Sequence, residues 1–200
     1  MVETVYKILL LIGAVICHEF AHGWVAYKRG DPTAKLAGRL TLNPFKHIDP
    51  VGSVLVPIIL NWLNLLPLGW ARPVPVNFQN LYNPRRDMIL VAMAGPATNF
   101  LLAVGFSLIL RLSGANWVQE FALLGIIINL VLAIFNLMPI PPLDGSRLIL
   151  GLLPSSAARF YGQLEPYGII IVLILLNLGF LDFVWKLVYL VMPLLGITID

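Results

Sequence analysis

The chain has 200 residues, of which 59% are hydrophobic and 12% charged, and its mean hydropathy is +0.88. Soluble domains are about 45–50% apolar and about 25% charged, so this composition excludes a soluble protein and predicts an integral membrane protein. The net charge of +3 comes from basic residues beside apolar segments, which indicates membrane topology rather than nucleic-acid binding.

The first apolar segment, about residues 5–27, contains the motif His18-Glu19-x-x-His22. Histidines four residues apart on a helix point the same way, so both imidazoles can bind one metal ion. Glu19 lies beside the first histidine and can reach a water in the metal's open position. This arrangement is typical of two zinc ligands and a general base for hydrolysis. Ionisable groups in a membrane helix are costly unless they have a function, which favours a metal site over a structural histidine pair.

Residues 31–50 follow the first helix and contain Pro, Gly, Thr and Asn. Apolar and polar residues alternate over 36–42, which predicts a short strand or hairpin at the membrane surface. His47 lies in this region. It is a possible metal ligand, but a lone histidine in a loop is more often structural or directed toward substrate.

The apolar segment 51–68 contains Pro57 and Asn61 and lies between two basic regions. A full crossing would place those regions on opposite sides of the membrane, against the positive-inside rule. We therefore expect a re-entrant or in-plane element. The basic residues expected on the cytoplasmic side are Lys28, Arg29, Lys35, Arg39, Lys46, Arg72, Arg85, Arg86, Arg147 and Arg159.

Residues 69–83 are rich in Pro and Asn. Prolines fix an extended backbone, and the part at 71–80 could form an edge against which a peptide substrate lies. The 36–42 hairpin is the other segment that could hold a substrate in an extended form.

A second long helix is expected over 87–112, and it carries Gly95-Pro96-Ala97-Thr98-Asn99. Gly and Pro at that depth allow close approach of another backbone, and Asn99 adds a hydrogen-bonding group in apolar surroundings. Two interpretations remain open for Asn99: a contact between helices, or a contact with substrate.

A third helix, about 117–137, is followed by Pro139, Pro141 and Pro142, which unwind its end and present Asp144 in an irregular loop. Zinc hydrolases need a third protein ligand. The first and third helices run in the same direction, so Asp144 comes to the depth of His22 and is the best candidate.

Asn136 lies just before these prolines. Its amide could replace hydrogen bonds that an unwound substrate has lost, or it could cap the carbonyl groups at the end of the helix. Beyond it we expect a short surface helix at 146–155. Two apolar segments, 168–178 and 183–195, are predicted to form an antiparallel pair that returns the C-terminus to the cytoplasm.

Three motifs in this order, His18-Glu19-x-x-His22, Gly95-Pro96-x-x-Asn99 and Asn136-x-x-Pro139-x-Pro141-x-x-Asp144-Gly145, resemble the site-2 protease family of intramembrane zinc metalloproteases. The resemblance implies Zn²⁺ as cofactor. It also implies a base, Glu19, and assigns the remaining site residues: metal ligands His18, His22 and Asp144, and substrate-binding residues Asn99 and Asn136. The chain departs from larger members in lacking an inserted PDZ-like or CBS-like domain.

We therefore predict an all-α polytopic membrane protein with about five transmembrane helices, the segment at 51–68 and the surface hairpin. Residues 1–200 form one metalloprotease domain, with a catalytic core at 5–145 and C-terminal helices at 146–200. Its expected activity is hydrolysis of peptide bonds within or near transmembrane segments of membrane proteins. The expected location is the plasma membrane of a prokaryote, in contact with lipid and with the site toward the cytoplasm. The alternatives are a metal-ion transporter and a metal-binding scaffold.

Overall fold

The structure, a computed structural model, describes residues 2–62 and 71–197, and within these ranges it is helical with no strand. The all-α prediction is confirmed. The α-helices are α1 (Val2–Lys28), α2 (Thr33–Leu36), α3 (Val56–Trp62), α4 (Pro84–Leu112), α5 (Asn116–Asn136), α6 (Asp144–Leu152), α7 (Ser155–Gly162), α8 (Gly168–Asn177) and α9 (Phe180–Val191). The shorter turns are η1 (Pro44–Lys46), η2 (Pro50–Leu55), η3 (Phe78–Asn80), η4 (Glu165–Tyr167) and η5 (Met192–Leu195).

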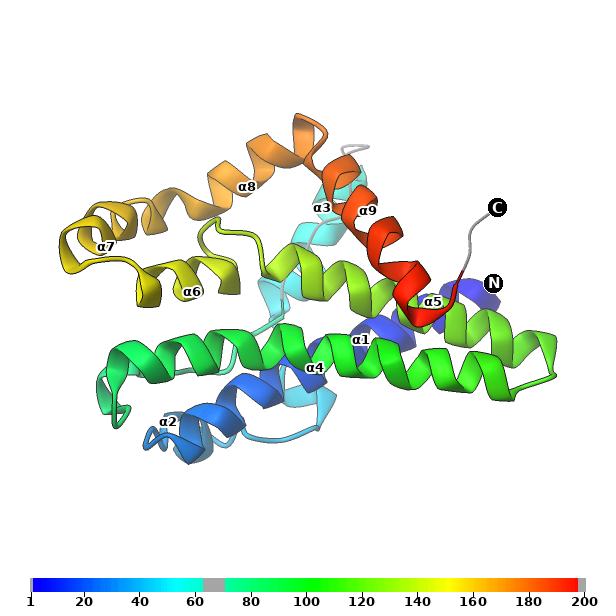
Figure 1. The fold of residues 1–200 in the computed structure, drawn as a ribbon, viewed down its shortest axis with the longest axis horizontal. Helices are drawn as coiled ribbons and strands as arrows, with labels where there is room; N and C mark the ends of the chain where they lie inside the picture. Colours follow the sequence, from blue (N-terminus) through cyan, green and yellow to red (C-terminus); the bar gives the residue numbers. More distant parts are fainter. Residues whose placement is uncertain (1, 63–70, 198–200) are drawn as a thin grey trace.

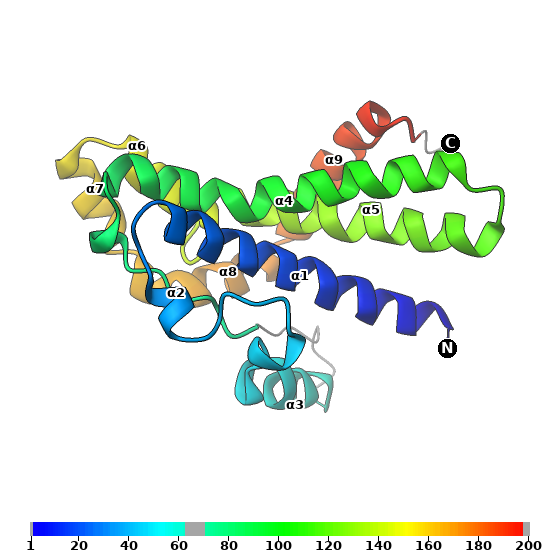
Figure 2. The same cartoon turned by 90° about the horizontal axis from the view of Figure 1, so that it is seen from below.

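The three longest helices, α1, α4 and α5, lie side by side and form the centre of the molecule (Figures 1 and 2). Each is long and apolar enough to cross a membrane. The segment Ser155–Asn177, which includes α7 and α8, is the fourth such span in the part of the chain that the structure describes. We predicted about five crossings, and this count of four is one lower.

The predicted hairpin at 36–42 is wrong, because residues 31–50 form α2, turns and η1. The reason lies in side chains that bond to the local backbone. The Asp31 carboxylate accepts a hydrogen bond from the Thr33 N–H at 3.1 Å, and the Asn43 side chain accepts one from the Phe45 N–H at 3.0 Å. Such local bonds offer the backbone an alternative to strand pairing.

The apolar segment at 51–68 does not separate its two flanks. The backbone N–H of Arg72 donates to the His47 carbonyl at 2.8 Å, and the N–H of Tyr82 donates to the Arg29 carbonyl at 2.9 Å. Between the flanks, η2 and α3 lie beside the bundle (Figure 2). The two flanks therefore lie side by side. The re-entrant or in-plane element stays a prediction, because its residues 63–68 lie outside the described ranges.

The C-terminal helices differ from the predicted antiparallel pair. The chain breaks at Gly179, whose φ of +85° is in the left-handed region that favours glycine. Beyond it, α9 packs its buried Val184 and Val188 against the core residues Ile126 and Leu130 of α5 rather than back along α8. The start of α1 and the end of α9 consequently lie at one end of the molecule, and α7 lies at the other (Figure 1). The predicted return of the C-terminus to the cytoplasmic side, where Lys28 was expected, has no support in this arrangement, because α9 ends near the start of α1 instead.

Candidate metal centre

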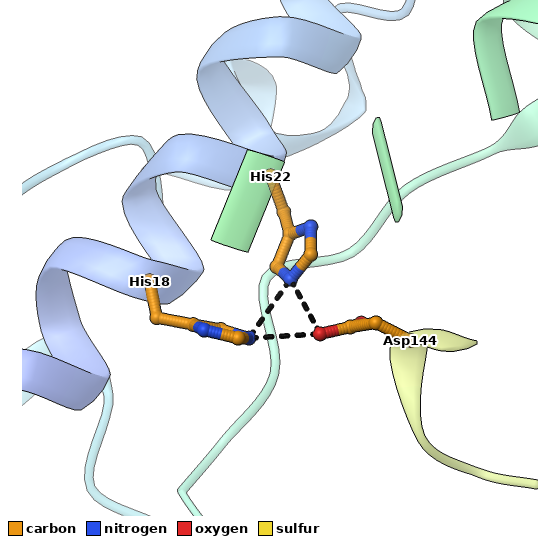
Figure 3. Close-up of side chains that lie close together, drawn as sticks. All are labelled: His18, His22 and Asp144. Atoms are coloured by element: carbon orange, nitrogen blue, oxygen red, sulfur yellow. Dashed lines mark hydrogen bonds and ion pairs between the residues drawn. The ribbon is translucent and has the colours of Figure 1, made fainter. Parts of the chain in front are cut away.

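Three side chains from distant parts of the sequence meet inside the bundle. His18 and His22 lie one turn apart on α1, and Asp144 is the first residue of α6 (Figure 3). The two Nε2 atoms are 3.0 Å apart, and Oδ2 of Asp144 is 3.0 Å from Nε2 of His18 and 3.2 Å from Nε2 of His22. Both histidines are buried. Three donor atoms thus form a nearly equilateral triangle.

The hydrogen bonds on the far side of each ring fix which nitrogen carries the proton. Nδ1 of His22 lies 2.7 Å from the backbone carbonyl of Val91, and Nδ1 of His18 lies 2.5 Å from Oδ1 of Asn99. Because both partners are acceptors, Nδ1 of each ring is the donor, and each Nε2 directs a lone pair at Asp144. Two lone pairs and a carboxylate oxygen converging on one point repel each other unless a cation lies between them.

The triangle also has the right size for zinc. Ligand bonds of about 2.0–2.1 Å in a tetrahedron place the ligand atoms about 3.3 Å apart, close to the observed 3.0–3.2 Å. Two neutral imidazoles and one carboxylate form a common ligand set of catalytic zinc, with the fourth position left for water or substrate. The residues present therefore fit a zinc ion.

Gly95 of α4 faces this triangle. A Cβ built at this position would collide with Nε2 of both histidines, so a residue with a side chain would displace the metal-binding atoms. Pro96 follows within the same helix, where it cannot donate a backbone hydrogen bond. The Val91 carbonyl that holds His22 lies in the preceding turn. The Gly-Pro pair thus shapes the wall behind the metal site.

Asp144 reaches the site because the chain folds back tightly after α5. A Cβ on the next residue, Gly145, would collide with the backbone carbonyls of Leu137 and Met138. Gly168 at the start of α8 packs against Pro141, where a Cβ would meet the backbone at 2.6 Å. These contacts hold the proline-rich loop between α5 and α6, as expected from its sequence, and place the first residue of α6 opposite α1.

Glu19 lies beside the triangle and is half-buried. Its Oε2 accepts a hydrogen bond of 2.7 Å from the backbone N–H of Val74, in the irregular segment 71–77. Gly23, one turn further along α1, leaves room for this segment, because a Cβ there would meet Cγ1 of Val74 at 2.7 Å. One carboxylate oxygen of Glu19 is thereby oriented by the backbone of segment 71–77.

The structure does not place all the predicted residues in the expected way. Asn99, for which a substrate contact was expected, is fully buried, and its amide bonds to His18, Ala14 and Asn129. It therefore holds the ring of His18 rather than facing substrate.

Asn136 is half-buried and donates to the Leu132 carbonyl one turn earlier at 3.0 Å, so its role toward substrate stays a prediction. His47 donates through Nε2 to the Thr41 carbonyl at 2.8 Å and is not part of the metal-binding group. In the described ranges, His18, His22 and Asp144 are the one group of at least three His, Cys, Asp or Glu side chains that could hold a metal ion.

Sequence reasoning missed two participants. Asn129 is a buried polar residue of α5, and a signal was present, because it lies two helical turns before Asn136 and interrupts the apolar stretch 121–135. Nothing in the sequence pointed to the backbone N–H of Val74, because nearly every residue has such a donor. Only the fold brings it to Glu19.

Known proteins resemble the chain over most of its length. The model of Peptidase family M50 matches residues 111–178. A protein of Bacillus subtilis (strain 168), "Putative zinc metalloprotease YwhC", is 42% identical over 180 residues, which are 85% of this chain and 79% of that protein. The chain belongs to peptidase family M50.

Two further relatives are longer proteins. Rip2 of Mycolicibacterium smegmatis is 32% identical over 84% of this chain and 66% of its own length. Rip3 of Mycobacterium tuberculosis is 28% identical over 88% of this chain and 39% of its own length. The chain thus spans less than two thirds of either protein. No solved structure gave a significant match.

Family M50 is the site-2 protease family, so the resemblance seen in the motifs is confirmed. The chain is an intramembrane zinc metalloprotease, and the transporter and scaffold alternatives are not favoured.

Proposed function

We propose that this M50 metalloprotease hydrolyses peptide bonds within or near transmembrane segments of membrane proteins, with His18, His22 and Asp144 as zinc ligands and Glu19 as general base. The observation that carries the proposal is the triangle of two Nε2 atoms and one carboxylate oxygen, 3.0–3.2 Å apart, beside Glu19. Zinc supplies Lewis acidity, which activates water near neutral pH and polarises a carbonyl group.

The chain's own residues perform the proton transfers. Glu19 takes a proton from the attacking water through its carboxylate and later delivers a proton to the leaving amine. The Val74 N–H holds one oxygen of Glu19 in a fixed direction during both transfers. The hydrogen bonds at Nδ1 keep the lone pairs of both histidines directed at the metal position.

The substrate must lose helical hydrogen bonds before its carbonyl can reach the site. The segment 71–77 lies in a non-helical form along α1, next to Glu19. We propose that it holds the unwound peptide and that Asn136, at the C-terminal end of α5, assists by bonding to the peptide's exposed groups.

We further propose that the protein lies in the plasma membrane of a prokaryote with the site toward the cytoplasm. With a rise of about 1.5 Å per residue, His22 is about 9 Å and His18 about 15 Å from the end of α1 at Lys28. That end carries the basic residues that favour the cytoplasmic side. Water therefore has a short path to the metal from that side.

The decisive experiment compares the wild type with Glu19→Gln on a model transmembrane substrate in detergent. The expected result is loss of cleavage with zinc content unchanged, because the amide cannot act as a base. Cleavage at the wild-type rate by Glu19→Gln would contradict the proposal. Measured zinc uptake into vesicles by both variants would instead support a transporter.

A further inference from the structure

The Nδ1 proton of His18 is fixed by a chain of hydrogen bonds that crosses three helices. His18 lies on α1, its partner Asn99 on α4, and the partner of that amide, Asn129, on α5. Asn99 and Asn129 are 0% and 1% exposed, so no water competes for these bonds. This hydrogen-bonded relay, formed by His18, Asn99 and Asn129, therefore lies in the dry interior between the three helices.

The direction of each bond in the relay follows from its far end. The backbone carbonyl of Gly125 can only accept, so the Asn129 amide, 2.9 Å away, donates to it through Nδ2. Oδ1 of Asn129 is then the atom that faces Asn99, and it accepts from Nδ2 of Asn99 at 2.9 Å. The same Nδ2 group donates to the Ala14 carbonyl at 3.3 Å.

With its N–H groups directed at these two acceptors, Asn99 presents Oδ1 to His18. Nδ1 of His18, at 2.5 Å, must carry the proton, and Nε2 keeps its lone pair for the metal. Flipping either amide would place two donors or two acceptors face to face in a dry interior, where each unpaired group is costly.

We infer that Asn129 is a positioning residue for the metal centre: acting through Asn99, it selects the tautomer and orientation of His18 that bind zinc. Partners of metal-binding histidines typically change metal affinity by about 10–100-fold when they are removed. Asn129 acts from a second layer, because two successive hydrogen bonds, through Asn99, connect it to the ring of His18. The inference rests on the proposed ligand set.

The test measures the zinc affinity of purified, folded protein by competition with a chromophoric chelator. Leucine has nearly the shape of asparagine and removes both hydrogen-bonding groups, so Asn129→Leu should lower the affinity at least tenfold. Ser107→Ala, which removes another buried polar group from the same bundle, is the matched control and should leave the affinity within about threefold. An unchanged affinity in Asn129→Leu would overturn the inference.

A double-mutant cycle distinguishes positioning through Asn99 from a general effect on packing. In an Asn99→Leu background, Asn129→Leu should cause no additional loss of zinc affinity, because the connection to His18 is already broken. Additive losses would contradict the relay. Thermal unfolding of the metal-free variants is recorded in parallel, since a purely structural role lowers stability and leaves the zinc affinity per folded molecule unchanged.

A second variant keeps the test open if Asn129→Leu does not fold. In Asn129→Ser the hydroxyl can still bond to the Gly125 carbonyl within α5, but it is too short to replace the amide at Asn99. It should lose zinc affinity to the same extent, and wild-type affinity would contradict the relay. His18→Ala is measured beside it: full zinc retention there would refute the ligand set itself, which is a separate failure.

Discussion

The carboxylate of Glu19 accepts a hydrogen bond from the backbone N–H of Val74, with 2.7 Å between Oε2 and N, although 55 positions separate the two residues. The bond joins Glu19 of α1, the proposed general base, to the irregular segment 71–77. Because a hydrogen bond to a charged group contributes about 1.5–3 kcal/mol, it holds the base in place before substrate arrives.

Replacing Val74 by proline removes this donor in a segment that already contains Pro73 and Pro75. We expect Val74→Pro to lower cleavage at least tenfold, because Glu19 loses its orientation, while zinc content stays at the wild-type level. Val76→Pro places the same change two residues further on and keeps the bond to Glu19, so it serves as the control in the same cleavage assay. Equal activities of the two variants would show that the bond does not matter.

The zinc ligands can be tested by metal analysis of purified protein. His22→Ala and Asp144→Ala should each lose most of the bound zinc, because two ligands remain where three converge within 3.2 Å. The wild type should hold one zinc per chain. If Asp144→Ala kept its full zinc content, Asp144 would be removed from the site.

Gly95 gives a steric test in which no polar group is altered. In Gly95→Ala the added methyl group collides with Nε2 of His18 and His22, so zinc content and cleavage should both fall strongly. Gly105→Ala is the matched control, because it lies in the same helix and a Cβ there meets nothing within 4 Å. If Gly95→Ala kept the wild-type zinc content, as Gly105→Ala should, the helices would have shifted to make room for the methyl group.

Asp31 gives a test of pH dependence outside the membrane spans. Burial disfavours its ionised form, but hydrogen bonds from Thr33, Asn80 and Asn77 outweigh burial and hold the pKa of Asp31 below its ordinary value. The folded state then binds the proton less readily than the unfolded state. The stabilisation is complete above the ordinary aspartate pKa of about 4, and it is lost as the pH falls through the lower folded value.

Wild-type protein should therefore unfold at lower temperature as the pH falls below about 4. The unfolding temperature of Asp31→Asn should fall less over the same pH interval. Asp182→Asn, at an exposed position, is the control and should follow the wild type. Thermal unfolding in detergent at a series of pH values measures the difference. Parallel curves for the wild type and Asp31→Asn would contradict the role of this carboxylate.

The course of the chain predicts where labelled positions lie. Single cysteines at Phe45 and Gln79, in a Cys17→Ser background, should react from one side of the membrane, because Arg72 bonds to His47 and closes the segment between them. A cysteine at Trp117, in the first turn of α5, should react from the opposite side. An impermeant thiol reagent applied to sealed cells and to inverted vesicles distinguishes the sides. Labelling of positions 45 and 79 from opposite sides would make 51–68 an ordinary crossing.

The sequence alone determined the class of the protein and its metal chemistry. Composition alone requires a membrane environment, and helical periodicity alone brings His18 and His22 to one face beside Glu19. Local rules also predicted the irregular loop before Asp144, because proline acts through its own backbone.

Tertiary structure decided the relationships that depend on contacts between distant segments. The hairpin prediction failed because the side chains of Asp31 and Asn43 accept hydrogen bonds from backbone N–H groups two residues further on. The antiparallel pair failed because α9 buries Val184 and Val188 against α5. The role of Asn99 could not be read from its motif either, since an amide is donor and acceptor at once. Only the positions of His18 and Asn129 around it determine which of its atoms faces the metal ligand.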